Sequence, residues 1–62
     1  MAWKYSFGFK LSGSGKARLS TYLINQGKKI IDVGWDYIVV DTKLNNTQIT
    51  AIKANVFLEE QV

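Results

Sequence analysis

The sequence contains neither cysteine nor histidine, and these two absences exclude several classes of function. Without cysteine the chain forms no disulfide and offers no thiolate to a metal or a substrate. Without histidine it also lacks the commonest zinc and copper ligand and the most frequent general base. The sequence therefore predicts no metal site and no cofactor.

Acidic residues are missing from the first half of the chain, so its charge is unevenly distributed. Residues 1–31 hold six basic side chains and no acidic one, whereas residues 32–62 hold two basic and five acidic ones. The halves thus carry +6 and −3, which together give the net charge of +3. Such asymmetry is typical of a protein with a nucleic-acid or other acidic partner, and equally of two halves that attract each other across a sheet.

Long apolar runs are also missing. The longest covers residues 37–40, far too few to span a membrane, and the first residues do not have the pattern of a signal peptide. We therefore expect an intracellular, cytoplasmic protein with no membrane contact. The 62 residues suffice for one domain, residues 1–62. A domain this small needs a good core or a partner subunit, and its aromatic side chains suit a core or an interface.

What the first half does contain is a two-residue alternation, which indicates β-strands. Residues 3–11 carry aromatic or apolar side chains at every odd position, and residues 16–24 alternate again after a Ser-Gly turn at residues 12–15. An odd-numbered turn is expected, because it places both apolar series on one buried face. A second loop, residues 25–27, is expected to hold Gly27 in the left-handed conformation.

The next segment is predicted to be a third strand that bends. Ile31, Val33 and Trp35 are expected on its core face, and Gly34 indicates a bulge or bend within it. Residues 36–41 are apolar on both faces, with Ile38 and Val40 directed away from the first core face. Such a strand is covered on both sides, by barrel closure or by a partner.

The last segment has two interpretations. After a turn at Asn45-Asn46, residues 47–58 fit a strand with Lys53 and Asn55 on one face. The opposite face of that strand would carry Ile52, Ala54, Val56 and Leu58. The same residues fit a helix capped by Asn46. We favour the strand.

The predicted fold class is therefore all-β: an antiparallel meander of four to five strands that forms a small curled barrel or a dimeric sheet. The alternative is an α+β fold, either a three-stranded sheet with a C-terminal helix or a β-α-β-β order. In a competing interpretation residues 17–33 form one helix, which Gly27 and several β-branched residues disfavour.

Residues 27–40 run from a turn glycine through a bent strand to the Asp36-Tyr37 pair, and residues 50–59 end beside an acidic residue. Together with the preceding strand, this pattern resembles the Sm-like and SH3-like small barrels over residues 17–58. The resemblance implies a small β-barrel. Because Val39-Val40 stand where RNA-binding members carry an asparagine, it implies the fold rather than RNA binding.

Catalytic residues are not predicted. The serines and threonines lack a base to activate them, and Asp32 and Asp36 are better explained by pairing with Lys16 and Arg18 on a neighbouring strand. Residues 12–16, Ser-Gly-Ser-Gly-Lys, lack the frame of a phosphate-binding loop. We therefore expect that the protein is not an enzyme.

The outer face of the predicted first hairpin is the candidate binding surface. Its expected nucleic-acid-binding residues are Lys4, Lys10, Lys16, Arg18 and Tyr22, with Lys28 beyond the second loop. Basic groups beside an exposed ring on a sheet are a known means of holding single-stranded nucleic acid, and an ordinary solvated face has the same composition.

Two functions are consistent with these features. The first is a small non-enzymatic module that binds single-stranded DNA or RNA. The alternative is a protein-interaction module, a small inhibitor or accessory subunit that binds through an apolar patch or a sheet edge. In either case we expect a homo-oligomer, because a doubly apolar strand is hard to bury in 62 residues.

Overall fold

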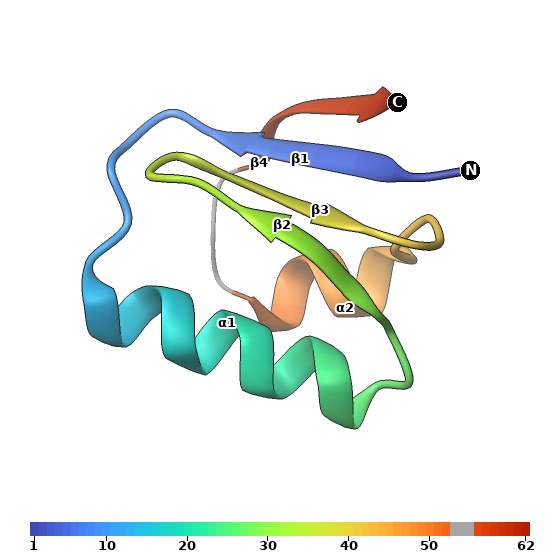
Figure 1. Cartoon of the computed structure of the whole chain (residues 1–62), viewed down its shortest axis with the longest axis horizontal. Helices are drawn as coiled ribbons and strands as arrows, with labels where there is room; N and C mark the ends of the chain where they lie inside the picture. The colour runs from blue at the N-terminus through green and yellow to red at the C-terminus, as the bar shows by residue number, and fades with distance from the viewer. Residues whose placement is uncertain (53–55) are drawn as a thin grey trace.

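The computed structural model describes residues 1–52 and 56–62. In these residues the chain forms four strands and two helices: β1 (Trp3–Phe7), α1 (Gly13–Asn25), β2 (Ile30–Val33), β3 (Tyr37–Val40), α2 (Asn46–Ala51) and β4 (Val56–Gln61). The strands form one antiparallel sheet in the order β2-β3-β1-β4. Both helices lie against the same face of the sheet and leave the other face open (Figure 1). This arrangement is the ferredoxin-like, split β-α-β topology.

The prediction of an all-β meander is therefore wrong. The fold is α+β, and the sheet is open, with β2 and β4 as its edges, rather than closed into a barrel. The barrel implied by the resemblance to Sm-like domains is not formed. A three-stranded sheet with a C-terminal helix is also wrong, whereas the β-α-β-β alternative matches the first four elements and lacks only α2 and β4.

Residues 13–25 form a helix where a strand was predicted. The alternation that suggested a strand also places Leu19 and Leu23 four residues apart, and both side chains are buried as the inner face of α1. Ser12 caps the helix, since its hydroxyl oxygen accepts a hydrogen bond of 3.0 Å from the Gly15 N–H. The first hairpin, and with it the outer face predicted to bind nucleic acid, is therefore absent.

Helix α1 ends at a glycine that the sequence identified correctly. Gly27 has a φ of 80°, as predicted, but it ends a helix instead of joining two strands. The N–H groups of Gly27 and Lys28 donate to the carbonyls of Ile24 and Leu23, at 3.0 and 2.9 Å. This is the Schellman pattern of a helix C-terminus. It explains why a helix over residues 17–33 does not form.

The predicted bent third strand is in fact two strands. Gly34 lies in the turn between β2 and β3, where its N–H donates to the Tyr37 carbonyl at 2.9 Å. The irregular pairing occurs earlier, between Ile30 and Asp32. Strand β3 lies inside an open sheet, between β2 and β1, so no barrel closes over it. Its Ile38 and Val40 pack in the core with β1, contrary to the expectation that they face away from it.

The two interpretations of the last segment each hold for part of it. Helix α2 forms first, and its cap is Asn45 rather than Asn46. The Asn45 side chain accepts from the Gln48 N–H at 2.8 Å, and the Gln48 side chain accepts from the Asn45 N–H at 3.1 Å. Strand β4 follows. The predicted alternation at Lys53, Ala54 and Asn55 lies outside the described residues.

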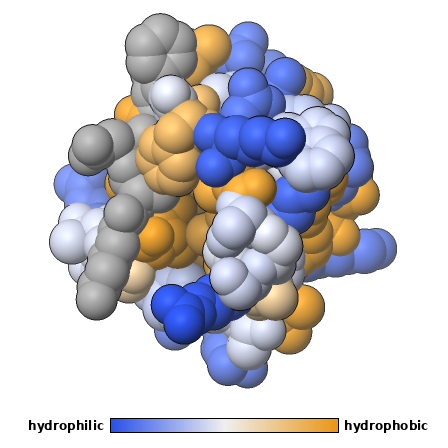
Figure 2. Space-filling model, turned by 90° about the vertical axis from the view of Figure 1, so that its left-hand side faces the viewer, coloured by the Kyte–Doolittle hydropathy of each residue, from blue (hydrophilic) through white to orange (hydrophobic). Residues whose placement is uncertain are grey.

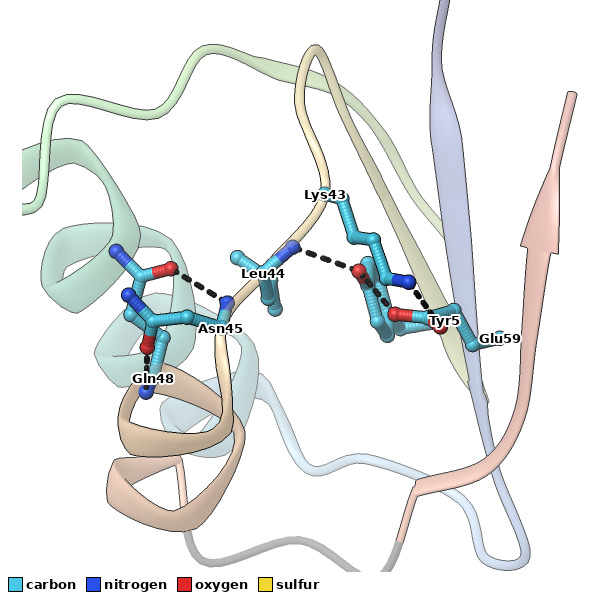
Figure 3. Close-up of polar contacts among 6 residues, drawn as sticks. All are labelled: Tyr5, Lys43, Leu44, Asn45, Gln48 and Glu59. Atoms are coloured by element: carbon cyan, nitrogen blue, oxygen red, sulfur yellow. Dashed lines mark hydrogen bonds and ion pairs between the residues drawn. The ribbon is translucent and has the colours of Figure 1, made fainter.

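The hydroxyl of Tyr5 is a polar group at the centre of this small apolar core. Tyr5 is fully buried on β1, where it pairs with Ile38 of β3. Its hydroxyl points toward Leu44 and Glu59 (Figure 3). Its hydroxyl donates to the Glu59 carboxylate on β4 at 2.6 Å and accepts from the Leu44 N–H at 2.7 Å. Lys43 adds an ion pair with Glu59 at 3.7 Å. One phenol thus connects β1, β4 and the segment that precedes α2.

We expect this phenol to make the free energy of unfolding decrease as the pH rises into the alkaline range. Burial, and then the hydrogen bond to Glu59, raise the pKa of Tyr5 from 10.0 to about 12. The folded state therefore holds this proton more tightly than the unfolded state. The resulting stabilisation is complete below pH 10 and is lost as the pH rises through about 12.

Tyr5→Phe should lower the free energy of unfolding at neutral pH by about 1–3 kcal/mol, because the Leu44 N–H loses its partner. Denaturant unfolding at a series of pH values compares the two chains. The difference between their free energies of unfolding should become smaller from pH 10 to pH 12. A difference that stays constant over that range would contradict the assigned role of the hydroxyl.

Candidate nucleic-acid interface

Two loops at one end of the sheet are joined by backbone hydrogen bonds. The Phe7 N–H donates to the Asp36 carbonyl at 2.7 Å, and the Leu11 N–H donates to the Trp35 carbonyl at 2.6 Å. The connection between β1 and α1 is thereby held against the turn between β2 and β3. The two loops, distant in sequence, lie side by side at this end of the molecule (Figure 1).

Trp35 stands at this end of the molecule and carries two lysines. Its side chain is 63% exposed. The Lys10 Nζ lies 4.3 Å from the centroid of the indole ring, and the Lys16 Nζ lies 4.1 Å from it. Each cation–π contact stabilises an exposed site by only about 0.5–1 kcal/mol, so either lysine can leave the ring for a better partner. The first turn of α1 and the loop before it thus bring two mobile cations to one exposed ring.

A shallow groove adjoins Trp35. It is lined by Ser6, Phe7, Gly8, Phe9, Lys10, Trp35, Asp36 and Leu58. Phe9 and Leu58 are 49% and 45% exposed. Figure 2 looks at this end of the molecule and shows hydrophobic side chains, in orange, lying directly among strongly hydrophilic ones, in blue. We call the groove with Trp35 and Lys16 the Trp35 surface.

A second hollow lies between α1 and the end of α2. Phe9 lines it as well, so this ring forms the ridge between the two hollows. Arg18 and Tyr22, one helical turn apart on α1, line the second hollow, with Ile52 on its other side. A third cation and another aromatic ring therefore lie next to the Trp35 surface.

The open face of the sheet carries a further cation–aromatic pair. The Lys4 Nζ on β1 lies 4.6 Å from the centroid of the Tyr37 ring on β3. The Tyr37 hydroxyl donates to the Asp32 carboxylate at 3.1 Å, and this hydrogen bond raises the pKa of Tyr37. The Tyr37 ring packs over Gly34, where a Cβ atom would collide with it. Gly34 is thus needed at this turn for the packing of the ring.

The structure distributes the six predicted binding residues over three places. Lys10 and Lys16 meet on Trp35, while Arg18 and Tyr22 line the adjoining hollow. Lys4 lies on the open sheet face. Lys28 lies at the other end of α1, where its Nζ donates to the Thr42 hydroxyl at 2.7 Å and to the Lys43 carbonyl at 3.2 Å. Lys28 is therefore not brought together with the others.

Sequence reasoning missed the two exposed rings, Phe9 and Trp35, because it assigned both to the buried face of a strand. Each ring directly follows a glycine, Gly8 or Gly34. A glycine after a regular alternation indicates the end of a strand, and the side chain beyond it need not continue on the core face. That signal was available for both positions.

In residues 1–52 and 56–62, no three acidic side chains lie close enough together to hold a metal ion. Neither α1 nor α2 has the length and apolar character needed to cross a lipid bilayer. No protein-family model, curated protein or solved structure matches this chain.

Proposed function

We propose that this domain binds single-stranded nucleic acid, DNA or RNA, on the Trp35 surface. The observation that carries the proposal is the exposed Trp35 ring with the Nζ atoms of Lys10 and Lys16 about 4 Å away. Proteins that hold single strands combine exposed rings, on which bases stack, with cations that follow the backbone. Both parts are present here within a few residues of one another.

The chemistry of the lysines supports this assignment. A lysine ammonium is a compact charge on a flexible stem, so it can turn from the indole ring toward a phosphate. A base can then occupy the face of the ring that a lysine has left. Arg18 in the adjoining hollow would extend the positive surface along the strand.

The exposed rings favour a single strand over a duplex. Phe9 and Trp35 stand on short loops at the rim of an open groove, where they can reach the faces of unstacked bases. In a duplex those faces are covered by neighbouring bases. Duplex of the same length should therefore bind more weakly to the Trp35 surface.

Replacing both lysines, Lys10→Gln with Lys16→Gln, should reduce affinity and also its dependence on salt. Each phosphate contact of a single strand contributes about 0.7 to the slope of log K against log salt, so the slope should fall by about 1.4. Fluorescence anisotropy with a labelled oligonucleotide, DNA and RNA in turn, measures both quantities.

The matched control is Lys28→Gln with Lys29→Gln, which removes the same charge at the other end of α1. This pair should leave the slope nearly unchanged. Equal losses in the two double variants would indicate unspecific attraction to a basic protein. Wild-type protein that binds no oligonucleotide at low salt would reject the proposal.

Trp35→Ala should weaken binding by about 1–3 kcal/mol, roughly fivefold to 150-fold, because one base loses its stacking partner. Its effect on folding should be small, since the side chain is largely exposed. Trp35→Phe keeps a ring and should retain part of the affinity. In a Trp3→Phe background the only remaining indole is Trp35, and its fluorescence should change on binding. An unaltered affinity of Trp35→Ala would place the bases elsewhere.

The alternative function is a protein-interaction module, and the exposed Phe9, Trp35 and Leu58 side chains would serve it as well. Two results together would favour it: the wild-type chain binds no oligonucleotide, and Trp35→Ala abolishes binding of a protein partner. The mixture of apolar rings with lysines at this surface leads us to prefer nucleic acid.

We also propose that the chain self-associates. One face of the sheet is not covered by α1 or α2, and Ile31, Leu58 and Val62 are large exposed hydrophobic residues on its strands or at its end. Pairing two such surfaces removes apolar area from water. Light scattering coupled to size exclusion should give the mass of a dimer or larger oligomer. A monomer at every concentration would contradict this.

A further inference from the structure

The groove beside Trp35 contains one carboxylate that the electrostatics of nucleic-acid binding does not explain. Asp36 lines this groove together with Lys10 and Trp35. A negative charge there repels phosphate, so on its own it weakens the binding of any oligonucleotide. Its presence among rings and cations calls for a ligand group that benefits from it.

The Asp36 side chain is exposed, and its backbone is fixed. Its carbonyl oxygen accepts the hydrogen bond from Phe7, which holds the residue at the end of β1. Among the described residues the Asp36 carboxylate makes no hydrogen bond and no ion pair. Asp32 differs, because its carboxylate accepts from the Tyr37 hydroxyl and from the Val33 N–H. Within residues 1–52 and 56–62, both carboxylate oxygens of Asp36 are therefore open to a ligand.

We infer that Asp36 selects guanine among the bases that stack on Trp35. The inference rests on the proposed binding of single strands. A carboxylate accepts two parallel hydrogen bonds from two neighbouring donors, and the Watson–Crick edge of guanine offers such donors at N1–H and at the exocyclic N2 amino group. Cytosine and adenine offer a single amino group.

Thymine and uracil fit this site worst. They have no exocyclic amino group, and their one N–H lies between two carbonyl oxygens that the carboxylate repels. The edges of unstacked bases are accessible in single strands, and proteins read them there by hydrogen bonds. The repulsion that Asp36 exerts on phosphate is thus offset only when an amino-bearing base occupies the groove.

The test uses short oligothymidines that carry one central guanine, hypoxanthine or thymine. Hypoxanthine differs from guanine only in lacking the amino group, so it separates hydrogen bonding from stacking. The oligonucleotide with guanine should bind roughly tenfold more tightly than the other two. Asp36→Asn should tighten binding of the hypoxanthine and thymine oligonucleotides, because a repulsive charge is gone. The guanine oligonucleotide loses its hydrogen bonds to the carboxylate at the same time, so the three affinities should come close together.

Glu60→Gln is the matched control, since it removes the same charge from an exposed side chain of β4 that does not line the groove. It should leave the preference for guanine unchanged. Wild-type binding without discrimination between guanine and hypoxanthine, or a preference that survives Asp36→Asn, would overturn the inference while the proposed function stands. Absence of binding to every oligonucleotide would overturn both. Thermal unfolding of each variant verifies that the fold is intact. Asp36→Ala removes the same carboxylate with a different replacement and measures the preference for guanine a second time.

Discussion

The buried hydroxyl of Tyr5 is the interaction on which the arrangement of this domain depends. Strand β1 lies inside the sheet, between β3 and β4, and both helices pack on the face that carries Tyr5. In a core of so few side chains, an unpaired phenol would cost about 1–3 kcal/mol. The hydroxyl avoids this cost through its hydrogen bonds to Glu59 and Leu44. Both bonds form only when β4 and the segment before α2 are in place. The polar contact therefore specifies the same topology as the apolar packing.

The position of β1 also determines where the candidate site lies. Beyond Phe7 the chain must leave the middle of the sheet and reach the start of α1, and it does so over the turn between β2 and β3. The two backbone hydrogen bonds to Trp35 and Asp36 hold this crossing against the turn. The apolar rings that no longer fit in the core, Phe9 and Trp35, are thereby exposed beside the lysines of the loop and of α1.

Much of the local structure could be predicted from the sequence, but the way in which the helices and strands pack together could not. The alternation at residues 3–7, the left-handed Gly27 and the apolar β3 each correspond to a structural feature. The error lay in residues 16–24, where Leu19 and Leu23 fit a strand and a helix equally well. Only the cap at Ser12 and packing against the sheet decide for the helix. Gly34 indicated that Trp35 need not stay on the core face, but nothing in the residue spacing indicated that Lys10 and Lys16 would meet on its ring, because that contact depends on tertiary structure.

The central claim is that single-stranded nucleic acid binds at the Trp35 surface. Backbone and indole resonances of the labelled protein, followed by NMR while a short single-stranded oligonucleotide is added, test it most directly. The account predicts that the largest shift changes fall on Phe9, Lys10, the Trp35 indole and Asp36, with little change at Lys28 and Lys29. Changes centred on the Lys28 end of α1, or no change at low salt, would contradict it.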